Sequence, residues 1–302
     1  MSGPDCPNGY VPNPAKDHHG IQVLPTHLKA SHLLTSSSCM VDDYVDDGKP
    51  VRARKVINTA HVLHFTFPEL LDEGGFPTVI NLIGGIMESP EGHDVLYAHG
   101  YVPKEVKSLF DDPSNRPKVT VTANKVYSYY FGYTPFSHGI TFRSAVINGH
   151  ASLLPYNEVI SRCQEEVSDA DIVPEDEKLW ALHKIVRGMF GGDDRWNNTR
   201  HPFKDEEVRR VPVLRVEIDS DTSRLHERVG LLGFQAPWET SNGDEVWEGA
   251  VPIWETYGDH IQGNTRREFP DYLDELFTER KKANEKEAVK EAKRPVPDLA
   301  RR

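Results

Sequence analysis

Hydrophobic positions gather in the middle of the chain, in short stretches separated by clusters of Gly, Pro and Asp. The stretches begin with VLHFTF at Val62 and continue through FPTVINLIGGIM, DVLYAHGYV, KVTVTANKVYSYYFGY and TFRSAVINGHASLL. A later stretch, VPVLRVEID at 211–219, alternates apolar and polar residues, which is typical of a strand with one packed and one solvated face. Short β-rich stretches at this spacing predict an antiparallel meander or a closed barrel.

A helical period follows these stretches. It begins near Tyr156 and recurs through EDEKLWALHKIVRGMF at 175–190, where Gly191-Gly192 ends it. The segment VWEGAVPIWETYG at 246–258 predicts a last strand. After about Gly263, a mixture of Glu and Lys predicts a solvated helix and then a disordered tail.

The first part of the chain has little to bury. Residues 1–55 are rich in Pro, His, Ser and Asp, which predicts an irregular arm with at most short structure. We therefore expect this arm, one β-rich domain over 56–262, and a charged helical or disordered tail over 263–302. A chain of 302 residues is long enough for one such core with extensions.

The amino-acid composition limits which binding partners and which cellular compartment we expect. Lys and Arg number 35 against 47 Asp and Glu, so the formal net charge is −12. This charge argues against nucleic acid as the main partner, because that affinity depends on cations that neutralise phosphates. The cysteines (Cys6, Cys39 and Cys163) are far apart and lack metal-ligand spacing, so we expect neither a disulfide framework nor a metal site. Without a signal-peptide pattern or an apolar run of about 18 residues, we expect a cytoplasmic protein that binds no membrane.

Two segments carry candidate chemistry, although the P-loop, GxGxxG, HExxH, GxSxG and CxxC motifs do not occur. In YAHGYVPKEVK, at 97–107, a predicted strand ends at His99-Gly100 and a predicted helix carries Lys104 and Lys107. Backbone N–H groups at a helix start, with ammonium groups nearby, can hold a phosphate. The same spacing also fits an ordinary strand–helix junction with exposed lysines, so both interpretations stay open.

The second segment is PFSHGITFRS at 135–144. Phe142 offers a flat face to a ring-shaped ligand and Arg143 offers a fork of donors, but Arg143 is equally suited to pairing with an acidic residue. His138 is the residue of this segment suited to proton transfer near neutral pH, and a structural role fits a single histidine as well.

Together these segments resemble the fungal flavin-nucleotide-binding proteins of the pyridoxamine 5'-phosphate oxidase-like family, from about Val62 to His260 and in the same order. The resemblance is carried by FPTVINLIGGIM, VLYAHGYV, TPFSHGITFRSAVINGHASLL, EKLWALHKIV, RWNNTRHP, VLRVEIDSDTSR and VWEGAVPIWE. It implies a mainly β fold with flanking helices, a six-stranded antiparallel split β-barrel of the FMN-binding type over 56–262. It also implies a homodimer with FMN bound in two equivalent clefts between the subunits.

The resemblance places the 97–107 segment at the flavin phosphate and the strand with Asn81 and Leu82 at the isoalloxazine ring. It also matches an Arg-Ser pair and a late tryptophan of the family. With the two segments above, the candidate cofactor contacts are Asn81, Leu82, His99, Gly100, Lys104, Lys107, Phe142, Arg143, Ser144 and Trp247.

The chain also departs from the family at polar positions. Relatives usually have Gly-x-Val-Ser-Ser-Arg after the histidine, whereas this chain has Gly100-Tyr-Val-Pro-Lys-Glu105, so the arginine becomes a glutamate. A carboxylate beside a phosphate is repulsive unless it is turned away or paired. In the segment from Ser137 to Ser144, this chain lacks one histidine, one asparagine and one tyrosine that relatives usually have.

Three hypotheses about function follow. The first is an FMN-dependent oxidoreductase that acts on a small organic molecule, with His138 or Tyr101 as proton donor and the redox chemistry supplied by the cofactor. The second is a cofactor-free split-barrel enzyme, such as an isomerase or cyclase of fungal secondary metabolism, or a ligand-binding protein that has lost flavin. The third is a noncatalytic dimeric binding module.

Overall fold

The structure is a computed structural model, and its main body comprises eight strands and six helices among the residues that it describes. Ser137, the three cysteines and residues 157–175 of the expected helical segment lie outside those residues. The described ranges are 20–23, 48–71, 75–132, 135–136, 138–156, 176–190, 192–200, 203–228, 246–264 and 268–294.

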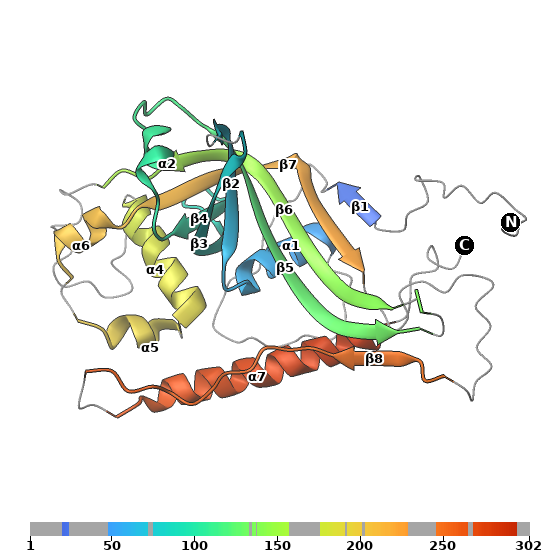
Figure 1. Cartoon of the computed structure of the whole chain (residues 1–302). Coiled ribbons are helices and arrows are strands. Elements are labelled where there is room, and N and C mark those ends of the chain that lie inside the picture. Colours follow the sequence, from blue (N-terminus) through green and yellow to red (C-terminus); the bar gives the residue numbers. More distant parts are fainter. Residues whose placement is uncertain are drawn as a thin grey trace, which may run out of the picture.

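Within these ranges, six antiparallel strands close into a barrel (Figure 1). They are β2 (Leu63–Leu71), β3 (Pro77–Glu88), β4 (Asp94–His99), β5 (Lys118–Phe131), β6 (Gly139–Leu153) and β7 (Val213–Arg228). Their order around the barrel is β7-β4-β3-β2-β5-β6, and pairing of β6 with β7 closes the ring. The expected fold class, a six-stranded split β-barrel with flanking helices, is confirmed.

Two short strands extend the sheet beyond the ring. Strand β1 (Gly20–Val23) pairs with the end of β7, and β8 (Gly249–Pro252) pairs with the end of β5. Strand β8 is shorter than the expected strand over 246–258. Its last residue is Pro252, and beyond it one further backbone hydrogen bond, from the Ile253 N–H to the Tyr127 carbonyl at 2.8 Å, reaches β5.

Irregular pairing bends the long strands. The register of β5 against β6 shifts between Val126 and Ser128, and the register of β6 against β7 shifts between Val146 and Asn148. An extra residue in one strand of a pair increases local twist and bends that strand. These shifts therefore help a sheet with strands of 14 to 16 residues to curve into a closed ring.

The barrel interior holds the main hydrophobic core, and helix α1 (Gly48–Thr59) packs into it. Ala53, Val56 and Ile57 of α1 are buried among core residues of β2 to β7. Helix α2 (Lys104–Ser108) adds Val106 to the same core. The domain boundary expected after residue 55 falls inside α1, which spans 48–59. Buried side chains lie on both sides of that boundary, so the whole helix packs as part of the barrel domain.

A second apolar cluster lies outside the barrel, under helix α4 (Glu177–Phe190). Ala181 and Ile185 pack there against Tyr97 of β4. The Tyr97 hydroxyl donates a 2.5 Å hydrogen bond to Glu177, and its ring lies edge-on to Trp180 at 5.5 Å. The short helices α5 (Gly192–Asn197) and α6 (Asp205–Arg210) follow α4 on the same side of the molecule (Figure 1).

Helix α7 (Asp271–Ala292) runs along β5 and β8 (Figure 1), and its Arg280 donates a 3.4 Å hydrogen bond to the Gly188 carbonyl of α4. The Glu and Lys mixture predicts a solvated helix here, but the last two turns bury Glu287, Ala288, Glu291 and Ala292. This prediction was wrong for these turns, because cations from the barrel and α1 pair with the two carboxylates. None of the described helices is both long and apolar enough to cross a membrane.

Candidate functional site

Four of the candidate cofactor contacts meet where β4 ends beside the middle of β3. Ile83 of β3 pairs with His99 of β4. Gly100, which follows His99, has a φ of +150°, and a side chain there would meet Leu82 at 3.0 Å and the Asn81 carbonyl at 3.7 Å. Asn81, Leu82, His99 and Gly100 are therefore neighbours, and we call them the β3–β4 corner.

The four residues of this corner present different groups. Leu82 points into the barrel core, so only its backbone is available outside. Asn81 is exposed, and its Oδ1 accepts a 2.8 Å hydrogen bond from Nδ1 of His64 on β2. Burial lowers the pKa of His99 below its usual value, so this ring is neutral near pH 7.

Two free ammonium groups stand beside the corner. Lys104 and Lys107 are exposed on α2, and neither side chain makes an ion pair or hydrogen bond within the described part of the chain. Residues three apart on a helix share a face, whereas Glu105 projects about 100° away from Lys104. The carboxylate that replaces the family's arginine is thus turned away from the face that the two lysines share. A helix of five residues has only a weak dipole at its N-terminus, so the two lysine side chains are the main groups of α2 that can bind an anion.

The other candidate cofactor contacts lie far from the β3–β4 corner of the same chain. His99 pairs with Val213 at the start of β7, whereas Phe142 of β6 pairs with Arg228 at its end. These two partners are 15 positions apart (228 minus 213), which is roughly 50 Å along an extended strand. The corner and the 142–144 segment therefore do not form one site in a single chain.

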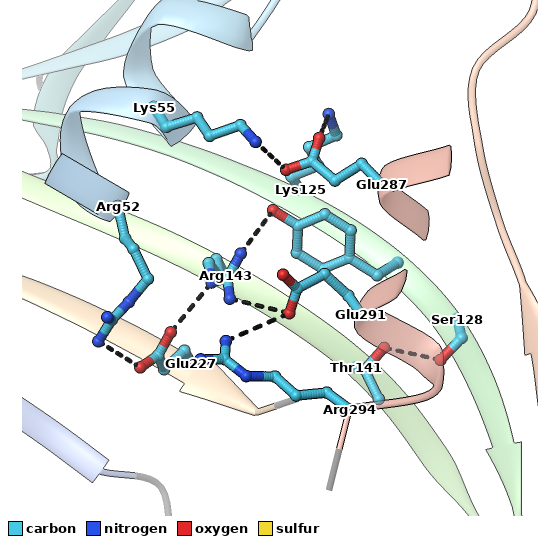
Figure 2. Close-up of polar contacts among 11 residues, drawn as sticks. Arg52, Lys55, Lys125, Ser128, Thr141, Arg143, Glu227, Glu287, Glu291 and Arg294 are labelled. Carbon is cyan, nitrogen blue, oxygen red and sulfur yellow. Dashed lines mark hydrogen bonds and ion pairs between the residues drawn. The ribbon is translucent and has the colours of Figure 1, made fainter. Parts of the chain in front are cut away.

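Arg143 lies in a buried ion-pair network rather than on an open surface (Figure 2). Its Nε donates to Glu227 at 3.0 Å, its Nη2 to Glu291 at 2.8 Å, and its Nη1 to the Tyr127 hydroxyl at 3.4 Å. Burial by itself would lower the pKa of Arg143, but Tyr127 and the two carboxylates raise it overall. All three guanidinium nitrogen atoms are engaged, and the charge persists at every pH at which the protein is folded.

The network continues through α1 and α7 (Figure 2). Glu287 of α7 pairs with Lys55 at 2.7 Å and with Lys125 at 2.8 Å, and Glu227 pairs with Arg52 at 2.9 Å. Burial by itself would raise the pKa of Glu287, but the two lysines outweigh it and lower the pKa. The name basic cluster is used below for the four cations that α1, β5 and β6 contribute, which are Arg52, Lys55, Lys125 and Arg143.

The lowered pKa of Glu287 predicts acid-sensitive docking of α7. A carboxyl group with a lowered pKa contributes stability that is complete above the unfolded value, about 4.3, and is lost as the pH falls through the folded value. We expect Glu287→Gln to lose about 2 kcal/mol of unfolding free energy at pH 7, and this gap from the wild type to close below pH 4. Urea unfolding at pH 7, 5, 4 and 3 measures the gap. Glu285→Gln, an exposed change on the same helix, is the control, and a gap that does not depend on pH would contradict the expectation.

The predicted proton donors lie in different places. Tyr101 follows the β3–β4 corner and is 82% exposed. His138 lies just before β6, where its Nδ1 accepts a 3.1 Å hydrogen bond from the Gly132 N–H. Its neutral ring therefore carries the proton on Nε2. His138 and Tyr101 are at opposite ends of the barrel, so one chain alone does not bring them together.

An exposed apolar face surrounds His138. Phe131 lies 5.9 Å from the His138 ring and 5.8 Å from Trp247, measured between ring centroids. Tyr129 pairs with Ile140 on one side and with Val251 on the other. We call this surface the aromatic face, and its exposed members are Tyr129, Phe131, Ile140, Trp247 and Val251.

Sequence reasoning missed two features of these sites. Tyr129 and Phe131 alternate with buried residues in the YSYYF stretch, and this two-residue period could have identified the aromatic face. Of the partners of Arg143, Glu291 comes from the segment assigned to a tail, and Glu227 lies 84 positions away, so neither pairing has a local signal at Arg143. The one local signal was Glu287 and Glu291, spaced one helical turn apart and each followed by an alanine.

A group of possible metal ligands lies elsewhere on the surface. Glu91, His93 and Glu217 offer ligand atoms within 4.8 Å of one another. The Arg215 guanidinium already pairs with Glu91 and Glu217, so a cation is in place among these carboxylates. This group is an exposed ion-pair cluster and adds nothing to the candidate cofactor site.

Comparisons with known proteins bear on the fold. No protein-family model matches the chain, and no curated protein is significantly similar to it. The FAD and heme binding protein from Mycobacterium smegmatis superposes with a TM-score of 0.53 at 14% identity, over 76% of this chain and 95% of that one. The flavocytochrome Anf3 from Azotobacter vinelandii gives a TM-score of 0.52 at 17% identity, over 75% and 89%.

A third structure is a pyridoxamine 5'-phosphate oxidase-related, FMN binding protein from Nostoc punctiforme. It matches 60% of this chain and 95% of its own at 11% identity, but its TM-score of 0.28 is too low to support an argument. The first two similarities extend over three quarters of the chain and confirm the split-barrel fold that the sequence resemblance implies.

Proposed function

We propose that this chain, a split β-barrel of the pyridoxamine phosphate oxidase-like type, binds FMN and acts as a flavin-dependent oxidoreductase on a small organic molecule. Two proteins that share its fold over most of their length are a FAD and heme binding protein and a flavocytochrome. A bound flavin supplies the electron transfer, and the protein contributes binding, orientation and proton transfer.

The observation that carries the proposal is the pair of unpaired ammonium groups on α2 beside the β3–β4 corner. Lys104 and Lys107 share one face, and they are free to bind the FMN phosphate. Gly100 has no side chain, which lets the end of β4 pack closely against Leu82 beside the two lysines. The exposed Asn81 amide offers a polar contact to the ring system.

We propose further that the protein works as a cytosolic homodimer. Phe142, Ser144 and Trp247 lie near the far end of β7, so they reach the corner only if a second chain supplies them. A two-fold axis uses each surface twice and brings opposite ends of two chains together. The aromatic face is apolar enough to be covered by such a partner. The same arrangement would bring His138 of one subunit towards Tyr101 of the other, so that either can donate a proton to the substrate.

The proposal predicts flavin binding that depends on Lys104. We expect the purified protein to be yellow or to quench the fluorescence of added FMN, and Lys104→Glu to weaken FMN binding at least about tenfold, which is about 1.4 kcal/mol. The reason is that a carboxylate replaces an ammonium group at the phosphate. Fluorescence titration measures the dissociation constant.

The matched control is Lys281→Glu, which makes the same charge change at an exposed position of α7. Equal FMN affinity in Lys104→Glu and Lys281→Glu would show that Lys104 does not contact the phosphate. Colourless wild-type protein that ignores added FMN would refute the flavin proposal itself.

One observation favours a second candidate function. Arg143, a cofactor contact by family resemblance, has all its nitrogen atoms engaged inside the protein. That arrangement suits a split-barrel protein without flavin, either a cofactor-free isomerase or cyclase or a ligand-binding protein. Absence of FMN binding, together with a His138-dependent conversion of an organic substrate, would support the cofactor-free enzyme.

A further inference from the structure

The basic cluster concentrates positive charge in an acidic protein. Within the described part of the chain, its four cations and the barrel carboxylate Glu227, which pairs with Arg52 and Arg143, together carry a charge of +3 (four minus one). The chain as a whole has a formal net charge of −12. Glu287 and Glu291 of α7 offset two of these three charges (Figure 2). The cluster therefore depends on α7 for most of its neutralisation.

The two α7 carboxylates occupy the cluster as a ligand would. Their side chains are only 8% and 9% exposed, and they lie one helical turn apart, so both project to the same side. Together they accept hydrogen bonds or ion pairs from Lys55, Lys125 and Arg143 at 2.7 to 2.8 Å. This is the length expected of charge-assisted hydrogen bonds.

The apolar contribution to this docking is small. Besides the two glutamates, the residues of α7 that are fully buried are Ala288 and Ala292, which carry one methyl group each. Burying a methyl group contributes about 0.8 kcal/mol, so electrostatic contacts hold most of these two turns. An anion from outside that supplies the same charge can therefore replace them.

We propose that the basic cluster is a binding site for a ligand with a compact, doubly charged phosphate group, and that Glu287 and Glu291 fill this site until such a ligand displaces the end of α7. A phosphate group carries the charge of the two carboxylates and offers acceptors to both lysines and to the arginine fork. Binding of the ligand and release of these two helical turns are then linked, because both compete for the same cations.

This inference does not rest on the flavin proposal. The cluster lies near the end of β7 that pairs with Phe142 and Arg143, whereas the two free lysines stand beside the β3–β4 corner. Inorganic pyrophosphate carries at least the two required negative charges near pH 7 and has no ring, so it probes the cluster without a flavin. FMN serves as a second probe, which tells whether a flavin phosphate also displaces the helix.

The first experiment is hydrogen exchange on the wild-type full chain, with pyrophosphate or with NaCl at the same ionic strength. We expect amides of 284–292 to exchange at least tenfold faster with pyrophosphate, and amides of 271–280 to change less. Unchanged exchange at 284–292 under saturating pyrophosphate would overturn the proposal. Faster exchange with FMN but not with pyrophosphate would also overturn the proposal, because a site for phosphate groups must respond to both.

The second experiment removes the internal competitor. Glu287→Gln/Glu291→Gln should bind pyrophosphate at least tenfold more tightly than Glu279→Gln/Glu285→Gln, measured by calorimetry. The control pair makes the same charge change at exposed positions of α7. Equal affinities would overturn the proposal. If the first variant does not fold, the exchange experiment on the wild type decides alone.

Discussion

A Gly84→Ala variant is expected to lose about 3 kcal/mol or more of unfolding free energy, a large part of the about 5–15 kcal/mol that stabilises a typical folded protein. A Cβ atom at this position of β3 would lie 2.0 Å from the Tyr97 carbonyl oxygen and 2.6 Å from the Ala98 Cα. Both are backbone atoms of β4, so relief requires the two strands to separate. That separation breaks the β3–β4 ladder inside the barrel.

Gly188→Ala is the matched control, and we expect the opposite sign. Gly188 lies in α4, and a Cβ atom there would meet nothing within 4 Å. Alanine is more favourable than glycine inside a helix by about 1 kcal/mol, so this variant should be slightly more stable than the wild type. Circular dichroism during thermal and urea unfolding measures both variants. Equal stability of the two would show that β3 and β4 do not approach as closely as described.

Much of the barrel could be predicted because its strands carry their own signals. The stretches that became β2 to β7 each have β-branched or aromatic residues and are bounded by Gly, Pro or Asp. Closure of the ring could not be predicted in the same way. It depends on pairing of β6 with β7 across dozens of intervening residues, and on irregular register that no local pattern marks.

The helices at the two ends of the chain show why polar segments are harder to predict. In α1, GKPVRARKVINT has cations among its apolar positions, so the burial of Ala53, Val56 and Ile57 is hidden in a polar stretch. In α7, the buried face consists of two glutamates and two alanines. The apolar stripe of α1 is thus short, and in both helices ion pairs with distant segments replace part of the hydrophobic contact.

The candidate site residues likewise fall into two groups, those brought together by neighbouring strands and those that pair with distant segments. Asn81, Leu82, His99 and Gly100 come together because consecutive strands pair, which a meander of strands already implies. Arg143 has its partners 84 and 148 positions away in sequence, at Glu227 and Glu291. An ion pair over such a separation has no local signature. The sequence therefore left open whether Arg143 binds a ligand or an acidic residue of the protein.

An Arg143→Met variant is expected to lose about 3–5 kcal/mol of unfolding free energy at pH 7. Methionine fills similar volume but leaves Glu291 with only Arg294, at 3.4 Å, and removes one partner of Glu227. The cost comes from these underpaired buried carboxylates, so it should shrink when one of them is removed. We expect Arg143→Met/Glu291→Leu to be more stable than Arg143→Met alone, because an apolar pair replaces the broken ion pair.

Urea unfolding of the wild type, both single variants and the double variant gives the coupling energy between the two positions. Arg116→Met, at an exposed arginine that bonds only nearby backbone oxygens, is the control and should stay within about 0.5 kcal/mol of the wild type. A double variant as unstable as the sum of its singles would show that Arg143 and Glu291 do not stabilise each other.

The same proteins separate two roles of Arg143. If the double variant folds and keeps its affinity for FMN, Arg143 serves to hold α7 on the barrel, whereas a folded double variant that has lost FMN binding would place the guanidinium at the cofactor.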